Sequence, residues 1–226
     1  MIPPKRHILL PVLGTVATRF YQQELQKQIG DAPIDLTLQP WDFEAINACL
    51  PDNFHSLSPL LLAALETLDW NSFDVLLIPN ITLQTQIDRL SLTAQQSRKI
   101  VHPVPVMLQE LQARKISSIT LAATRHTMKS HQLSTYFSHK GIEVKRPRPE
   151  DMLSIDALRL QVYEGSDPEV LEVLKERLTQ ILQPYPNVLL ACSELSLLNP
   201  EARYLDLCRS QIKAAVAGLQ SRGTSD

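Results

Sequence analysis

Cysteine is scarce in this sequence, and long apolar runs are lacking. The 226 residues include three cysteines, Cys49, Cys192 and Cys208, which form neither an even set nor a close pair. We therefore expect no disulfide framework, and reduced thiols in a cytoplasmic protein are the simplest interpretation. No apolar run reaches the roughly 18 residues that suggest a membrane helix, so no membrane partner is expected.

An excess of charge of either sign is also absent. Lys and Arg number 22 against 24 Asp and Glu, for a formal net charge of -2, and the basic residues are scattered. This pattern favours neither a nucleic-acid partner nor a membrane surface. The first seven residues are basic, but the apolar stretch after them is short and contains Pro11 and Gly14. We expect a first strand there rather than a signal peptide.

Several common catalytic and cofactor motifs are missing. Neither a Gly-x-Ser-x-Gly elbow nor a Walker lysine loop occurs. Residues 13–18 contain one glycine, Gly14, where a dinucleotide-binding fingerprint needs three. His126 and His131 are five residues apart, which does not place them on one helical face, and no further ligands cluster with them. We therefore expect no metal site.

Short apolar runs alternate with helical patterns along the chain, which predicts an α/β protein. The predicted strands are Ile8–Leu10, Ile34–Leu38, Val75–Ile78, Ile119–Ala123, Ile142–Lys145 and Val188–Ala191. Several are continuously apolar, as parallel strands covered on both faces are. The predicted helices are Thr18–Ile29, Leu57–Leu68, Met107–Arg114, Met128–Lys140, Glu169–Leu182 and Leu205–Leu219. Gly30 and Gly141 follow two of them, where a left-handed helix cap is expected.

The two halves of the chain repeat one plan. The strands at positions 8 and 119 begin 111 residues apart, and Gly30 and Gly141 are separated by the same interval. Val-Leu-Leu-Ile-Pro-Asn80 also resembles Val-Leu-Leu-Ala-Cys192, at an interval of 112. Three matches in register indicate an internal duplication. We predict two similar open parallel-sheet domains about a pseudo-twofold axis.

The predicted domains are residues 1–102 plus 205–226, and residues 103–204. The proline-rich tract around Pro103 and Pro105 is the predicted crossover, and the helix from Leu205 returns to the first domain. Open parallel sheets bind ligands at the carboxyl ends of their strands. If the two domains face each other about the pseudo-twofold axis, the loops at Asn80 and Cys192 meet across one cleft.

Cys192 is the thiol placed where chemistry is expected. Four apolar residues deliver it to a strand end, and polar residues follow. Loop amides and a helix N-terminus would stabilise its thiolate and lower its pKa. The alternative is that Cys192 is a small core residue, since cysteine is often buried. Cys49 and Cys208 fall within predicted helices and are expected to pack in the core.

Threonines and an asparagine mark the other loops at strand ends. Asn80 and Thr82 can donate hydrogen bonds to a carboxylate, or they simply open the next helix, with Thr82 as its N-cap. Thr124, Thr127 and the free amides behind them would form an anion cradle, or Thr127 is only a cap. Thr15 lies in the corresponding loop of the first half.

These motifs resemble those of the aspartate/glutamate racemase superfamily, whose members need no pyridoxal phosphate. Members carry a first loop ending in Ala-Thr, then Pro-Cys-Asn-Thr-Ala-His, Gly-Thr-x-x-Thr-Met and Gly-Cys-Thr-Glu. The counterparts in this chain are Gly14-Thr-Val-Ala-Thr18, Pro79-Asn-Ile-Thr-Leu-Gln84, Ala123-Thr-Arg-His-Thr-Met128 and Ala191-Cys-Ser-Glu194. The matches run in order and span nearly the whole chain. The resemblance implies two similar α/β halves, no cofactor and a homodimer.

The resemblance also implies a mechanism, from which this chain departs at one place. In the family, one cysteine removes the α-proton from one face of an amino acid, and a second returns a proton to the opposite face. Asn80 stands in the place of the first cysteine and cannot act as a base near neutral pH. Ile81 replaces the family asparagine, and Gln84 replaces the family histidine.

The leading hypothesis is an isomerase: a cofactor-independent amino-acid racemase acting on a small carboxylate. Cys192 is its acid/base, and Asn80 takes the position of the missing thiol. The expected contacts to substrate are Thr15, Thr82, Thr124, Thr127, Ser193 and Glu194. One alternative is a one-thiol decarboxylase resembling arylmalonate decarboxylase. The other is an inactive member that binds an acidic metabolite or a protein partner.

Overall fold

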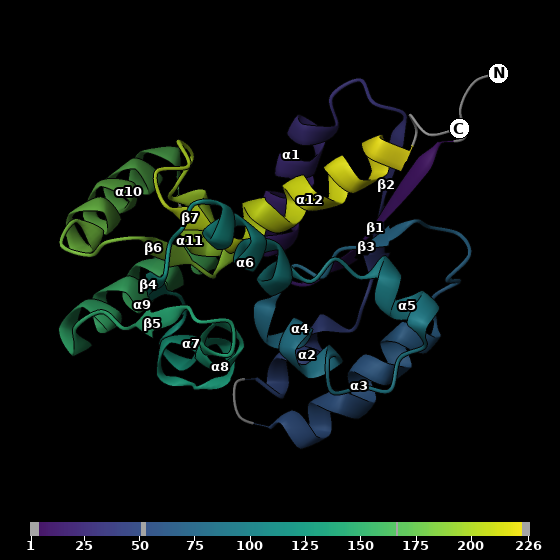
Figure 1. Cartoon of the computed structure of the whole chain (residues 1–226), viewed down its shortest axis with the longest axis horizontal. Helices are drawn as coiled ribbons and strands as arrows, with labels where there is room; N and C mark the ends of the chain where they lie inside the picture. The colour runs from purple at the N-terminus through teal and green to yellow at the C-terminus, as the bar shows by residue number, and fades with distance from the viewer. Residues whose placement is uncertain (1–4, 51–52, 166, 223–226) are drawn as a thin grey trace. The chain divides into compact units, whose positions relative to one another are not determined.

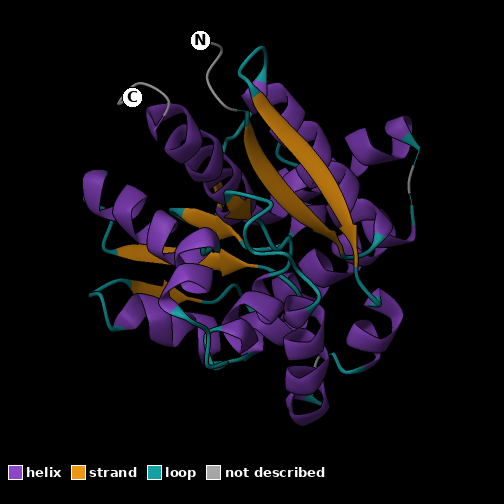
Figure 2. Ribbon diagram, turned by 90° about the vertical axis from the view of Figure 1, so that its right-hand side faces the viewer, coloured by secondary structure: helices purple, strands orange, loops and turns teal. Residues whose placement is uncertain are grey.

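The computed structural model describes residues 5–50, 53–165 and 167–222. The chain divides into two compact units, which are described separately. The first comprises the chain up to His102 together with the segment from Gln211, and the second is Pro103–Ser210. The fold is α/β, as predicted, with every paired strand parallel to its neighbours (Figures 1 and 2).

The first unit is built on a three-stranded sheet of order β2-β1-β3, formed by Arg6–Val12 (β1), Ile34–Pro40 (β2) and Val75–Leu76 (β3). Its helices are Thr15–Ile29 (α1), Phe43–Ala48 (α2), Phe54–Glu66 (α3), Ile81–Ile87 (α4) and Ala94–Lys99 (α5), and Leu207–Arg222 (α12) reaches it from the second unit. Leucines of α3 pack in one cluster with Leu9 and Leu76 of the sheet. Tyr21 of α1 donates a hydrogen bond to Gln211 of α12 at 2.7 Å, so the last helix closes this unit.

The second unit has a four-stranded sheet of order β5-β4-β6-β7, formed by Ser118–Ala122 (β4), Glu143–Lys145 (β5), Val188–Leu190 (β6) and Leu205–Asp206 (β7). Its helices are Pro103–Ala113 (α6), Arg125–Lys129 (α7), Gln132–Ser138 (α8), Pro149–Glu164 (α9), Pro168–Leu182 (α10) and Ser193–Leu197 (α11). Val188, Leu189 and Leu190 are all buried, which explains the continuously apolar β6.

The duplication predicted from the sequence is visible in both sheets. Each unit places its first strand in the middle, with the next two on either side, as β2-β1-β3 and β5-β4-β6. The loops after β3 and β6 end in residues of nearly equal conformation, Asn80 at φ −156°, ψ 115° and Cys192 at φ −157°, ψ 131°. Each of these residues is the N-cap of the helix that follows. The sequence match therefore reflects equivalent structural positions.

Three sequence-based expectations about the elements were wrong. Leu205 does not begin a helix, because Leu205–Asp206 pairs with β6 and α12 starts at Leu207. The helix predicted over Met128–Lys140 is two helices, since Ser130 is extended at ψ 154°. Helix α9 was missed because exposed apolar residues such as Leu153 and Leu160 blur its periodicity. Gly30 and Gly141, expected as left-handed helix caps, have positive φ at 52° and 77°, but the ψ of Gly30 is −126°, outside the left-handed helical region.

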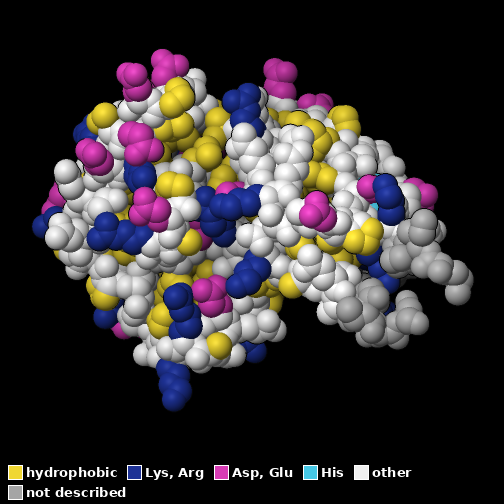
Figure 3. Space-filling model, turned by 90° about the horizontal axis from the view of Figure 1, so that it is seen from above, with side chains coloured by type: hydrophobic (Ala, Val, Ile, Leu, Met, Phe, Trp, Pro, Cys, Tyr) yellow, Lys and Arg dark blue, Asp and Glu magenta, His cyan; other side chains and the backbone are white. Residues whose placement is uncertain are grey.

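The surface is charged without a dominant sign. On the face that Figure 3 displays, Lys and Arg side chains are interspersed with Asp and Glu. Within the described ranges, no helix combines the length and hydrophobicity that crossing a membrane requires.

Gly14 gives a stability prediction. Its φ is 79°, and an added Cβ would lie 3.0 Å from the Phe43 ring, so Gly14→Ala meets both backbone strain and a clash. We expect a loss of about 1–3 kcal/mol in the free energy of unfolding, measured by denaturant titration. Gly218→Ala is the control, because Gly218 lies in α12 with open space around it and should gain up to about 1 kcal/mol. Equal effects of the two substitutions would contradict this prediction.

Candidate functional site

Cys192 lies at the junction of a buried strand and a short helix. It follows β6 by two residues and is the N-cap of α11, with 9% of its surface exposed. Its side chain makes no capping hydrogen bond to the helix. Ser, Thr, Asn and Asp are the residues that usually fill this position, and replacing them costs about 1 kcal/mol. Capping of the helix therefore does not explain why a cysteine occupies this position.

The Cys192 side chain is paired with a carboxylate. Its Sγ–H donates a hydrogen bond to Glu194 Oε2 at 2.7 Å, and Ser193 Oγ donates to the same oxygen at 3.1 Å. Ser193 and Glu194 are both 7% exposed, so the three side chains form a buried polar cluster. The structure thus brings together three of the residues predicted for the site. We call Cys192, Ser193 and Glu194 the thiol cluster.

The protonation state of the thiol differs from the expectation. Burial raises the pKa of the Cys192 thiol well above its ordinary value, the Glu194 charge and hydrogen bond raise it further, and the Arg159 guanidinium opposes them. The predicted lowering of this pKa was wrong. Desolvation and a neighbouring anion outweigh the helix N-terminus, which belongs to a helix of only five residues. At neutral pH the group is a thiol, able to donate a proton.

At the start of α7, where an anion-binding site was predicted, the amides of Arg125 and Thr127 already have protein hydrogen-bond partners. Thr124 is the N-cap, and its Oγ1 accepts from the Thr127 amide at 3.1 Å, so Thr127 is not the cap. The two threonine hydroxyls are 2.9 Å apart, and the Arg125 amide donates to Asp156 Oδ1 at 3.0 Å. The sequence suggested that the amides of Arg125 and Thr127 are free to bind an anion. In the structure, both amides donate to protein oxygens. The hydroxyls remain as neighbours at the helix start.

In the first unit, Asn80 is a helix cap. Its Oδ1 accepts from the Leu83 amide at 3.1 Å, so Asn80 and not Thr82 opens α4. Gln84, at the family histidine position, is fully buried; its Nε2 donates to the Ile78 carbonyl at 3.4 Å, and its Oε1 has no hydrogen-bond partner in the described chain. Thr15 is exposed at the first position of α1.

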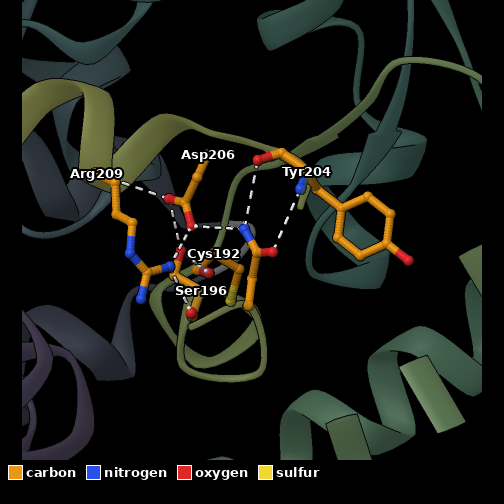
Figure 4. A network of polar contacts seen from close by, with 6 residues as sticks. Cys192, Ser196, Tyr204, Asp206 and Arg209 are labelled. Atoms are coloured by element: carbon orange, nitrogen blue, oxygen red, sulfur yellow. Dashed lines mark hydrogen bonds and ion pairs between the residues drawn. The ribbon is translucent and has the colours of Figure 1, made fainter. Parts of the chain in front are cut away.

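Sequence reasoning missed a second polar group behind the thiol cluster. Ser196, Asp206 and Arg209 connect α11, β7 and α12 by hydrogen bonds (Figure 4). Asp206 gave no signal because it stood at the start of a predicted helix, where an acid is ordinary. For metals, the described segments contain no group of three or more His, Cys, Asp or Glu side chains that could hold an ion.

Solved structures of known proteins share this architecture. The aspartate racemase of Picrophilus torridus has a TM-score of 0.73 and 15% identity, with 98% of this chain and 95% of that chain covered. An aspartate racemase homologue from Pyrococcus horikoshii has a TM-score of 0.69 and 14% identity, covering 98% and 100%. The chain has the aspartate/glutamate racemase fold. A glutamate racemase from Francisella tularensis in complex with D-glutamate gives a TM-score of 0.56 and 11% identity, covering 96% and 82%.

No family model matches the chain, and no curated protein matches it in sequence. The racemase fold is therefore established by structure at sequence identities of 11% to 15% in these three comparisons. At such identities a shared fold does not fix the activity, which must be argued from the site.

The thiol cluster gives a prediction about reactivity. Glu194→Gln removes the negative charge that raises the pKa of the Cys192 thiol. The pH dependence of Cys192 alkylation by iodoacetamide, followed by mass spectrometry, should therefore move to lower pH, with faster labelling at neutral pH. Cys49 in the same sample is the internal control. An unchanged profile, or a shift to higher pH, would contradict the assigned role of the carboxylate.

Proposed function

We propose that the protein is a cofactor-independent amino-acid racemase that transfers the α-proton of a small amino acid through Cys192. The observation that carries the proposal is the hydrogen bond from the Cys192 thiol to the Glu194 carboxylate, at the strand end where this fold carries its ligand loops. The fold shared with aspartate and glutamate racemases supports it.

The thiol and the carboxylate can generate a base without changing the buried charge. When Sγ–H passes its proton to Glu194 Oε2, 2.7 Å away, the negative charge moves from oxygen to sulfur and the pair stays singly charged. The thiolate then takes the α-proton of the substrate, and the electron pair left on the α-carbon spreads into the substrate carboxylate. Returning the proton from Sγ–H reverses the step. The raised pKa of the thiol makes this proton transfer unfavourable, so the thiolate forms only transiently within the cycle.

The substrate α-proton is far less acidic than a thiol, so the carbanion must be stabilised. Orientation and exclusion of water supply this in enzymes of the type. Arg159 lies close enough to lower the pKa of Cys192, and its guanidinium is a cation suited to a carboxylate. The proposed contacts to substrate are the hydroxyls of Thr15, Thr82, Thr124, Thr127 and Ser193. The D-glutamate complex of a related fold supports an amino-acid ligand.

Asn80, which replaces the second acid/base, leads us to expect that α-proton exchange and inversion of the amino acid have different rates. An amide cannot supply the second acid/base, and its oxygen already caps α4. Cys192 alone is sufficient for exchange of the α-proton with solvent on one face. Inversion requires a second proton donor, for which we propose a water molecule. Exchange is therefore expected to be faster than racemisation.

Proton exchange in heavy water tests the proposal. Wild-type protein with L-aspartate or L-glutamate should lose the α-proton NMR signal, and chiral analysis should show slower formation of the D-enantiomer. Cys192→Ser should reduce the exchange rate by about a hundredfold or more, since it removes the acid/base. Cys49→Ser is the matched control and should retain the rate. Equal exchange by both variants, or no exchange with either substrate, would contradict the proposal.

A second candidate function is favoured by the protonated thiol. In a one-thiol decarboxylase, the bond from the α-carbon to a carboxylate breaks, carbon dioxide leaves, and the remaining electron pair takes the proton of Sγ–H. Such chemistry needs a donor rather than a base, and needs no second thiol at Asn80. Carbon dioxide release from disubstituted malonates, dependent on Cys192, would identify it. A raised melting temperature with a dicarboxylate, without either reaction, would indicate an inactive binding protein.

A further inference from the structure

The loop that carries Cys192 is held from both sides by one aspartate. Asp206 pairs with Leu190 in the β6–β7 ladder, two residues before Cys192. Its carboxylate Oδ1 accepts from Ser196 Oγ at 2.9 Å, four residues after Cys192. The backbone of Asp206 thus fixes where the strand ends, and its side chain fixes where α11 lies. Cys192 is in the short segment between these two points.

The carboxylate is itself held by a buried set of donors. Asp206 is 5% exposed, and it also accepts from the Arg209 amide at 3.1 Å, from Arg209 Nη1 at 2.8 Å and from Asn199 Nδ2 at 3.5 Å. Arg209 Nη1 donates to the Ser196 carbonyl at 2.7 Å. The same arginine therefore also binds the last turn of α11. In Figure 4 the side chains of Arg209 and Ser196 converge on Asp206. Charge-assisted bonds of this kind are stronger than neutral ones.

In the described part of the first unit, the corresponding position does not hold an acid. Leu76, the counterpart of Val188 at the interval of 112, forms a parallel bridge with Ile100, so His102 occupies the position that corresponds to Asp206. The helix of the first unit begins with Asn80, which caps it with its own side chain. Cys192 provides no such cap. Asp206, on the edge strand β7, accordingly occurs in the second unit, where Cys192 begins α11.

We propose that Asp206 is the positioning residue of the Cys192 loop, holding the thiol through Ser196 and the β6–β7 ladder so that it meets Glu194. The inference deepens the proposed function, because the reaction needs the sulfur in one place. A five-residue helix is not stable without tertiary support. Loss of the carboxylate should therefore displace the thiol while the sheet persists.

The test compares Asp206→Asn with Asp151→Asn. Asp151 is a matched control: it is a buried aspartate of the same unit, it binds an arginine three residues away, Arg148, at 2.8 Å, and its other partner is Tyr185. In the heavy-water assay, Asp206→Asn should lower kcat by about tenfold to a hundredfold and leave KM nearly unchanged. It should also speed Cys192 alkylation at neutral pH by about tenfold, since a displaced thiol is less buried. Asp151→Asn should change neither quantity.

Ser196→Ala keeps the test decisive if Asp206→Asn fails to fold. It removes one hydroxyl and should lower kcat several-fold, and in the double variant the two effects should not add, because both act through one contact. Wild-type values of kcat and alkylation in both single variants would overturn the positioning role. If the wild type shows no exchange at all, the proposed function fails, and the alkylation rates alone decide the positioning role: faster in Asp206→Asn supports it, unchanged overturns it.

Discussion

The contact between the Cys192 thiol and the Glu194 carboxylate is the interaction on which the proposed chemistry of this protein depends. A buried carboxylate is costly unless it is hydrogen-bonded, and here the donors are the thiol at 2.7 Å and the Ser193 hydroxyl at 3.1 Å. The same burial and charge keep the thiol protonated. The site therefore holds a protonated thiol in direct contact with a carboxylate that can accept its proton.

The duplicated fold makes the asymmetry of the two halves informative. Equivalent loops end in Asn80 and Cys192 with nearly equal backbone angles. The asparagine satisfies its own helix, whereas the thiol is turned to Glu194 and leaves the support of its helix to Ser196 and Asp206. One half thus has a helix cap at the tip of its third strand, and the other has a thiol that is hydrogen-bonded to a carboxylate. The proposed function accordingly uses a single acid/base rather than a symmetric pair.

Much of the fold could be predicted because buried parallel strands have a strong sequence pattern. Val188–Leu190 is apolar at every position, and the interval between Gly30 and Gly141 revealed the repeat. The elements that the sequence did not predict depend on tertiary contacts. The two-residue strand Leu205–Asp206 exists only because β6 offers it a partner. Asp206 therefore looked like an ordinary helix-start acid.

The sequence could indicate that Cys192, Ser193 and Glu194 lie together, but it could not indicate the electrostatics of the thiol. The sequence placed Cys192, Ser193 and Glu194 in one loop, and the structure joins them by hydrogen bonds. The sign of the thiol pKa shift could not be obtained, because it depends on how completely the sulfur is buried and on which way Glu194 points. Nor could the sequence show that the Asp156 carboxylate binds an amide of α7.

The hydrogen bond from the Cys192 thiol to Glu194 is tested most directly by the S–H stretching band of Cys192 in the infrared spectrum at neutral pH, recorded with Cys49 and Cys208 replaced by alanine. We expect a band that is present, lies at lower frequency than that of a free thiol because of the hydrogen bond to Glu194, and returns toward the free-thiol frequency in Glu194→Gln. A missing band, which would mean a thiolate, or a band that Glu194→Gln does not move, would contradict it.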